Sequence, residues 1–214
     1  DQLLNFLLST LKDQSRTTVK SLLAHQQITV NKTVTIDLNG YTIENKTANN
    51  TTQLGNAADE CIVFYVDGAE ANLTLNATNG GKVIATGDGS TSYYNTAVWV
   101  TNGATATING GEYSNTADPE NDGCDLIYAS EGAKIIINRG EFIATRNNGA
   151  DAAENEYNVL NLKDKSGSEI IVYGGKFHGF DPANNLSENP AISFVADGYK
   201  SVETSEGIWE VMPA

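Results

Sequence analysis

The sequence is poor in the residues that build disulfide scaffolds, membrane spans and basic surfaces. Of 214 residues, two are cysteine, four are proline and one is methionine. No apolar run approaches the ~20 residues that a transmembrane helix requires. Lys and Arg number 13 against 27 Asp and Glu, so the formal net charge is −14. This charge disfavours nucleic acid and anionic membrane as partners, because phosphate binding needs a basic face.

The residues that are abundant indicate a folded chain of short strands. The hydrophobic fraction of 40% is too high for a disordered acidic chain, and the 20 glycines suit tight turns. Two cysteines do not make a disulfide framework. Because the single methionine is Met212, we expect the chain to be a processed product or a part of a larger protein.

The N-terminal segment differs in pattern from the rest of the chain. Leucines in residues 1–12 follow the i, i+3/i+4 spacing of an amphipathic helix. From Ile28 to Ile43 apolar and polar residues alternate, which is typical of half-buried strands. We therefore expect a capping helix followed by strands.

An internal repeat follows Cys61. A Gly-Gly or Arg-Gly pair precedes a short apolar strand four times, with second glycines at 81, 111, 140 and 175. A second strand lies upstream of each glycine pair, and a third lies upstream of a turn such as Asn102-Gly103. A unit this small buries its apolar residues only by stacking on a neighbour. The repeat predicts an all-β fold, a single-stranded right-handed parallel β-helix with three strands per coil and an N-terminal amphipathic capping helix.

The predicted organisation has three parts. Residues 1–18 form the capping helix and lead-in, 19–198 the parallel β-helix, and 199–214 a closing segment that folds back over the last coil. Both ends of a β-helix expose strand edges, so each end needs a cover. Asn72 and Asn76 flank one strand, where asparagine suits stacked ladders.

The phrase Val34-Thr-Ile-Asp-Leu-Asn-Gly-Tyr-Thr-Ile43, with its repeated glycine corners, resembles the pectate-lyase-like β-helix superfamily. The repeated sequence pattern is similar to that of members found in gut-bacterial surface proteins and in phage fibres and capsid appendages. The resemblance covers about residues 19–214. It implies the fold, whereas enzymes and inert spikes both use that fold.

Catalytic patterns of that superfamily are weak in this chain. Lyases of the fold combine a calcium site with an Arg or Lys base, and hydrolases use two or three Asp. Arg139 stands alone at a corner, and His25 and His178 are separated by most of the repeats. The sequence contains no HExxH, P-loop or CxxC motif. These features favour a protein without catalysis.

One acidic cluster is a candidate calcium site. Asp118, Glu120 and Asp122 alternate before Gly123, as in the first half of a DxDxDG loop, but Ala129 occupies the position of the bidentate glutamate. A solvated acidic insertion is the favoured interpretation. We expect no cofactor, with calcium as the alternative.

Aromatic residues predict a candidate glycan-binding face. Counting four residues back from the turn glycines at 68, 103 and 132 gives Phe64, Trp99 and Tyr128, which would stack outward. Insertions after the third strands add Tyr93, Tyr94 and Tyr157. The alternative is that an insertion covers this column and makes it a secondary core.

The sequence therefore predicts a non-catalytic structural or adhesive module of a phage virion appendage, a fibre or capsid decoration, or of a bacterial surface protein. A side face would bind a glycan or host surface, extracellularly, on a virion or a cell. Neighbouring subunits and a homotrimer are further candidate partners; nucleic acid and membrane insertion are not expected. The alternative function is a carbohydrate-active enzyme, a polysaccharide lyase or glycoside hydrolase.

Overall fold

The computed structural model describes residues 22–24, 27–46, 60–86, 94–116, 124–145, 157–184, 187–188 and 192–214. Within these ranges the regular secondary structure consists of β-strands alone, so the described part of the chain is all-β. No helix in it is long and apolar enough to cross a membrane. The helix predicted within residues 1–12 lies outside the described residues.

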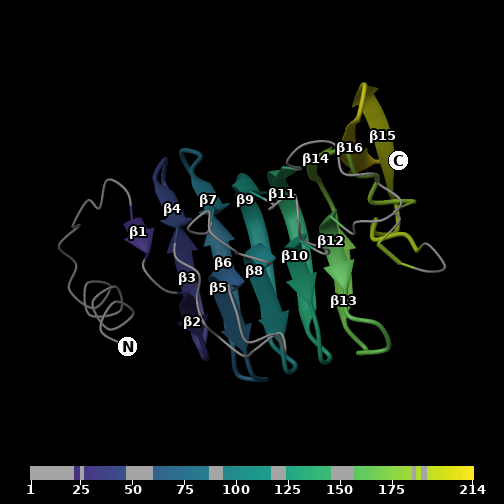
Figure 1. The fold of residues 1–214 in the computed structure, drawn as a ribbon. Coiled ribbons are helices and arrows are strands. Elements are labelled where there is room, and N and C mark those ends of the chain that lie inside the picture. Colours follow the sequence, from purple (N-terminus) through teal and green to yellow (C-terminus); the bar gives the residue numbers. More distant parts are fainter. Residues whose placement is uncertain are drawn as a thin grey trace.

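Two sheets make up the fold (Figure 1). The five-stranded sheet is entirely parallel and has the order β12-β10-β8-β5-β2. Its strands are β2 (Ile28–Val30), β5 (Glu60–Asp67), β8 (Tyr94–Thr101), β10 (Cys124–Ala129) and β12 (Tyr157–Leu162).

The eleven-stranded sheet follows the path β1-β4-β7-β9-β11-β14-β16-β15, with β3, β6 and β13 paired beside it. Its strands are β1 (Leu22–Ala24), β3 (Thr33–Asp37), β4 (Thr42–Asn45), β6 (Asn72–Asn76), β7 (Lys82–Ala85), β9 (Thr105–Thr116), β11 (Lys134–Thr145), β13 (Glu169–Val172), β14 (Gly175–His178), β15 (Tyr199–Ser205) and β16 (Ile208–Pro213).

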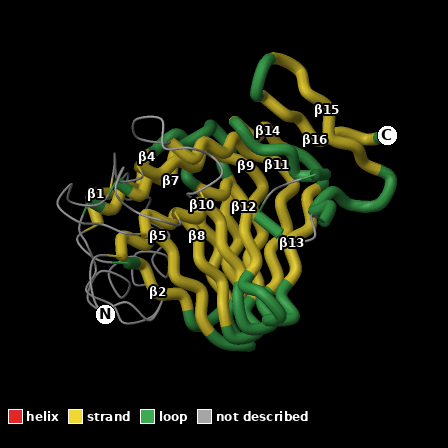
Figure 2. The backbone as a smooth tube through the Cα atoms, turned by 45° about the vertical axis from the view of Figure 1, so that its right-hand side comes forward, coloured by secondary structure: helices red, strands yellow, loops and turns green. Residues whose placement is uncertain are grey.

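Each repeat contributes one strand to the smaller sheet, turns, and then enters the larger sheet. The tight turns of successive repeats stack at one end of the strands (Figure 2). Backbone hydrogen bonds join these turns: Gly68 N–H donates to Thr101 O, Gly103 N–H to Glu131 O, and Gly132 N–H to Ser166 O. The sequence repeat is therefore matched by a repeat of backbone pairing.

The prediction of a single-stranded right-handed parallel β-helix with three strands per coil is wrong in two respects. First, β9 and β11 are each 12 residues long and span both strands expected around a glycine corner. Second, the larger sheet is mixed, because β16 pairs antiparallel with β14 and β15.

Glycines explain the continuous strands. Gly111 and Gly140 have φ of 101° and 146°, where a side chain is strained. The pairing of β9 with β11 shifts register on either side of Arg139 and then continues to Thr145. The glycine corners therefore act as bulges that bend a strand without ending it.

Inward-facing side chains of both sheets form the main core. Tyr113, Phe142 and Phe177 occupy equivalent positions on β9, β11 and β14 and stack with nearly parallel rings, with centroids 5.2 and 5.0 Å apart. All three are fully buried. Equivalent positions along parallel strands thus carry aromatic residues that pack on one another.

The segment 199–214, predicted to close the last coil, forms the hairpin β15–β16. This hairpin lies at the far end of the strand series in Figure 1. β16 pairs with β14, placing Trp209 opposite Phe177 and against the main core. The hairpin extends the sheet and covers the edge of β14.

Candidate functional site

The predicted aromatic column is present, with one change of residue. The register aligns Tyr65 with Trp99, and Trp99 with Tyr128. Phe64 is fully buried in the main core, so its outward position was predicted wrongly. The glycine comes one residue earlier in the turn after β5 than in the turn after β8, since Gly68 directly follows Asp67 whereas Gly103 is the second residue after Thr101. Counting back from the glycine therefore gives the wrong residue on β5.

This column forms a second, smaller cluster on the outer side of the five-stranded sheet. Tyr65 and Trp99 have ring centroids 4.8 Å apart, Trp99 and Tyr128 are 6.0 Å apart, and Ile62 joins them. Tyr65 and Trp99 are only 6% and 4% exposed, and Tyr128 is half-buried. The geometry therefore matches the secondary-core alternative more closely than an open stacking platform.

Polar contacts fix the indole within this cluster. Trp99 Nε1 donates to Ser130 Oγ at 2.9 Å, and Ser130 Oγ donates to Thr101 Oγ1 at 2.8 Å. All three residues are buried. A buried N–H group needs an acceptor, and Ser130 supplies it.

The other predicted residues are not brought together by the described part of the chain. Tyr94 and Tyr157 begin β8 and β12, which lie on either side of β10. Tyr93 and the proposed calcium ligands Asp118, Glu120 and Asp122 lie outside the described residues. Within the described ranges, no three His, Cys, Asp or Glu side chains group as metal ligands.

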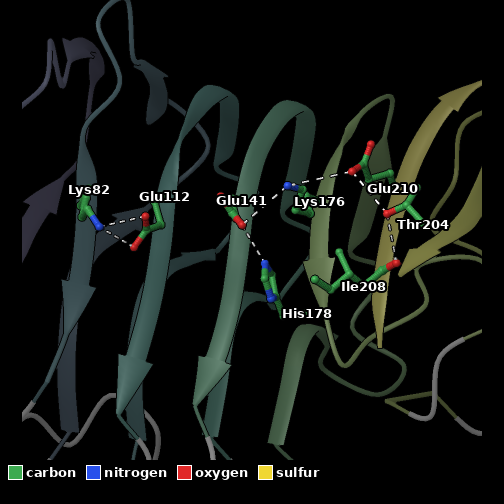
Figure 3. A network of polar contacts seen from close by, with 8 residues as sticks. All are labelled: Lys82, Glu112, Glu141, Lys176, His178, Thr204, Ile208 and Glu210. Carbon is green, nitrogen blue, oxygen red and sulfur yellow. Dashed lines mark hydrogen bonds and ion pairs between the residues drawn. The ribbon is translucent and has the colours of Figure 1, made fainter. Parts of the chain in front are cut away.

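A charged strip crosses the outer face of the eleven-stranded sheet (Figure 3). Its members take equivalent positions on successive strands from β7 to β16, apart from His178, which lies two residues after its neighbour on β14. The strip consists of Lys82, Glu112, Glu141, Lys176, His178 and Glu210.

Opposite charges are paired along this strip. Lys82 Nζ lies 2.9 Å from Glu112, and His178 Nε2 lies 2.8 Å from Glu141 Oε1. Lys176 Nζ stands between Glu141 and Glu210, 4.0 Å from each. These side chains are 30–49% exposed, so water screens each pair and each contributes only ~0–1 kcal/mol. The strip therefore holds two groups of paired charges, which meet where Glu112 and Glu141 stand opposite each other.

An amide ladder runs along the corner of the same sheet. Asn109 Nδ2 donates to Asn76 Oδ1, and Asn138 Nδ2 donates to Asn109 Oδ1, both at 2.8 Å. The predicted ladder role is confirmed for Asn76, whereas Asn72, predicted together with it, pairs in register with Thr105 and is not a member of this ladder. In the next repeat Tyr173 takes the ladder position, since Val172 pairs with Ile137. The alignment Ile-Asn-Gly-Gly, Ile-Asn-Arg-Gly, Val-Tyr-Gly-Gly contains this signal.

A further polar group lies at the β12 edge of the smaller sheet. Asp125 accepts hydrogen bonds from Asn158 Nδ2 at 3.3 Å and from Asn161 Nδ2 at 2.9 Å. Glu188 accepts a hydrogen bond from Leu162 N–H at 3.0 Å. Burial raises the pKa of Glu188 above its ordinary value, although this hydrogen bond lowers it and the nearby Asp164 raises it further.

Comparisons of the chain with protein-family models, with curated proteins and with solved structures gave no match.

Proposed function

We propose that the protein is a non-catalytic structural and adhesive module of a virion appendage, a fibre or capsid decoration, or of a bacterial surface protein. In this role it works outside the cell, on a virion or a cell surface. Its stacked repeats give a stiff scaffold, and a side face binds a glycan or a host surface.

One observation carries this proposal: ion pairs and side-chain hydrogen bonds link neighbouring strands across the outer face of the eleven-stranded sheet. Ion pairs link β7 to β9 and β11 to β14 and β16, and the amide ladder links β6, β9 and β11. Side chains that bond across strands hold neighbouring repeats in register. Such a face suits presentation of a fixed surface better than chemistry.

The location of the binding face follows from exposure. Tyr65 and Trp99 are buried, whereas the side chains of the charged strip are partly exposed and Asn138 is exposed. We therefore assign the presenting role to the outer face of the larger sheet. With a net charge of −14, neutral glycans are favoured over acidic ones.

A carbohydrate-active enzyme is the second candidate, and one observation favours it. Glu112 and Glu141 are register partners on neighbouring strands, and His178 contacts Glu141. Glycosidases use two carboxyl groups, one ionised and one protonated. Here each carboxylate contacts a lysine side chain on the same sheet face, so the two groups have similar surroundings, whereas a glycosidase pair has two different ones.

A single protein sample tests both functions. Dextran, mannan and a neutral galactan, with polygalacturonate as the acidic comparison, are measured for binding by affinity electrophoresis and for release of reducing sugar. We expect binding of a neutral polysaccharide without turnover. Turnover that Glu141→Gln abolishes, and that the control Glu169→Gln leaves intact, would establish the enzyme. Binding of none of these would reject the adhesive role.

A further inference from the structure

The corner between β13 and β14 carries an exposed aromatic ring. Tyr173 is 38% exposed, and Tyr199 packs edge-on against it with ring centroids 5.4 Å apart and an interplanar angle of 85°. Tyr173 N–H donates to Ile137 O at 2.8 Å, which fixes its backbone against β11. The backbone at Tyr173 is therefore bonded to β11, and its ring packs on Tyr199 at the surface.

Gly174, which follows Tyr173, lets this corner approach the end of the amide ladder at Asn138. A Cβ at Gly174 would lie 2.5 Å from the carbonyl oxygen of Asn138, so the two repeats touch at this corner. Asn138 uses its Nδ2 to bond Asn109, which directs its Oδ1 away from that bond. Asn138 is itself exposed. Because Ile137 pairs with Val172, the last amide of the ladder stands at the strand position next to that of Tyr173.

A cationic donor completes the group. Arg139 is exposed and forms no ion pair with any residue in the described ranges. Its counterparts in the sequence repeat are Gly110 and Gly174, and the backbone register places Asn109 opposite it on β9. The guanidinium offers five N–H donors in a planar fork.

We propose that Tyr173, Asn138 and Arg139 form a subsite for one hexose of a neutral glycan. The C–H face of a sugar ring packs on the exposed tyrosine, while its hydroxyl groups donate to Asn138 Oδ1 and accept from Arg139. This inference rests on the proposed adhesive function and names its contact point on the sheet.

Substitutions test the subsite against the polysaccharide that the wild-type protein binds among dextran, mannan and galactan. We expect Tyr173→Ala and Arg139→Ala each to weaken binding about tenfold. Tyr173→Phe keeps the ring and retains binding. Tyr41→Ala, a half-buried tyrosine near the other end of the sheet, is the matched control and leaves binding unchanged. Urea unfolding of each variant verifies that the fold persists.

The possible outcomes distinguish failure of the proposed subsite from failure of the proposed adhesive function. Wild-type binding that survives Tyr173→Ala overturns the subsite and leaves the adhesive role standing. Equal loss in Tyr41→Ala also overturns it. If the wild-type protein binds none of the three neutral polysaccharides, the adhesive role fails and the subsite fails with it.

Discussion

A buried indole depends on one hydroxyl group for its hydrogen bond. Trp99 Nε1 donates to Ser130, and both residues are covered. An N–H group that loses its partner inside a protein keeps the full penalty of leaving water. Ser130 is therefore more important than an ordinary serine at the end of a strand.

Ser130→Ala should lower the free energy of unfolding by ~1–3 kcal/mol, because Trp99 Nε1 would lose its acceptor. Urea denaturation followed by tryptophan fluorescence measures the change. Ser114→Ala, on the outer face of β9 and half-buried, serves as the control and should change stability by less than ~0.5 kcal/mol. Equal effects of the two substitutions would contradict the assigned bond.

Glu188→Gln should stabilise the protein at neutral pH. Burial raises the pKa of Glu188 in the folded state, so the native carboxyl binds a proton more readily than the unfolded one. Its ionisation therefore costs stability as the pH rises through the folded pKa, and glutamine avoids this cost while still accepting from Leu162 N–H.

Unfolding measured at pH 7 and again below the ordinary glutamate pKa of ~4.3 checks the sign. The advantage of glutamine should be present at pH 7 and disappear in acid. An advantage of the same size at both values would mean that ionisation of Glu188 is not its cause.

At the scale of single residues, the sequence predicted the outward positions of Trp99 and Tyr128 but placed Phe64 where Tyr65 lies. The period of two gives the alternation of faces, whereas the count back from the turn glycine depends on where the glycine stands in the turn. It is the first residue after β5 and the second residue after β8. A slip of one residue exchanges the two faces of a strand. The sequence did not decide whether Trp99 is buried, because alternation of apolar and polar residues does not show which segment covers the outer face of a strand.

At the scale of secondary-structure elements, glycines at different turns and corners are needed for different reasons. Gly132 has φ of 73° and open space where a Cβ would lie. Gly174 lacks a positive φ but faces the carbonyl oxygen of Asn138. The first glycine is needed for backbone conformation, and the second is needed for close approach of two repeats.

Gly174→Ala should therefore cost ~3 kcal/mol, because a backbone oxygen cannot move aside without shifting β11. Gly132→Ala should cost ~1 kcal/mol. Asparagine, which tolerates positive φ, should recover stability at position 132 and fail to recover it at 174. Denaturant midpoints of the four variants give the comparison, and recovery by Gly174→Asn would contradict the steric account.

The sequence predicted most of the strands in the repeats but not their continuity. Glycine pairs usually mark the end of a strand, and here the same residues bend β9 and β11 while pairing continues on both sides. Composition cannot separate a bulge from a turn, because both use glycine at positive φ. The difference depends on the neighbouring strand, which a single repeat does not contain.

For the whole molecule, the hairpin β15–β16 covers a sheet edge. β16 bonds to β14 and places Trp209 against the core, while the edge behind it would otherwise offer free N–H and C=O groups. Exposed edges of this kind pair with other chains. The sequence predicted a closing role for residues 199–214 but gave no strand direction, since direction depends on the sheet that the segment joins.

A chain shortened to end at Gly198 should associate as its concentration rises, because the edge of β14 and the ring of Phe177 become accessible. Size-exclusion chromatography with light scattering measures the mass over a concentration series, with the 214-residue chain as the control. A shortened chain that stays monomeric throughout would show that β16 is not needed as a cover.

The reversed direction of β16 also sets a rule for growth of the stack. Parallel repeats are interchangeable, because each offers the next strand the same orientation, so duplicating one repeat upstream would lengthen the structure by ~4.8 Å. β16 runs antiparallel to β14, so a further parallel repeat placed beyond the hairpin would not find a neighbour in the same orientation. Duplication of a repeat within the gene would therefore lengthen the stack while the C-terminal hairpin stays unchanged and ends it.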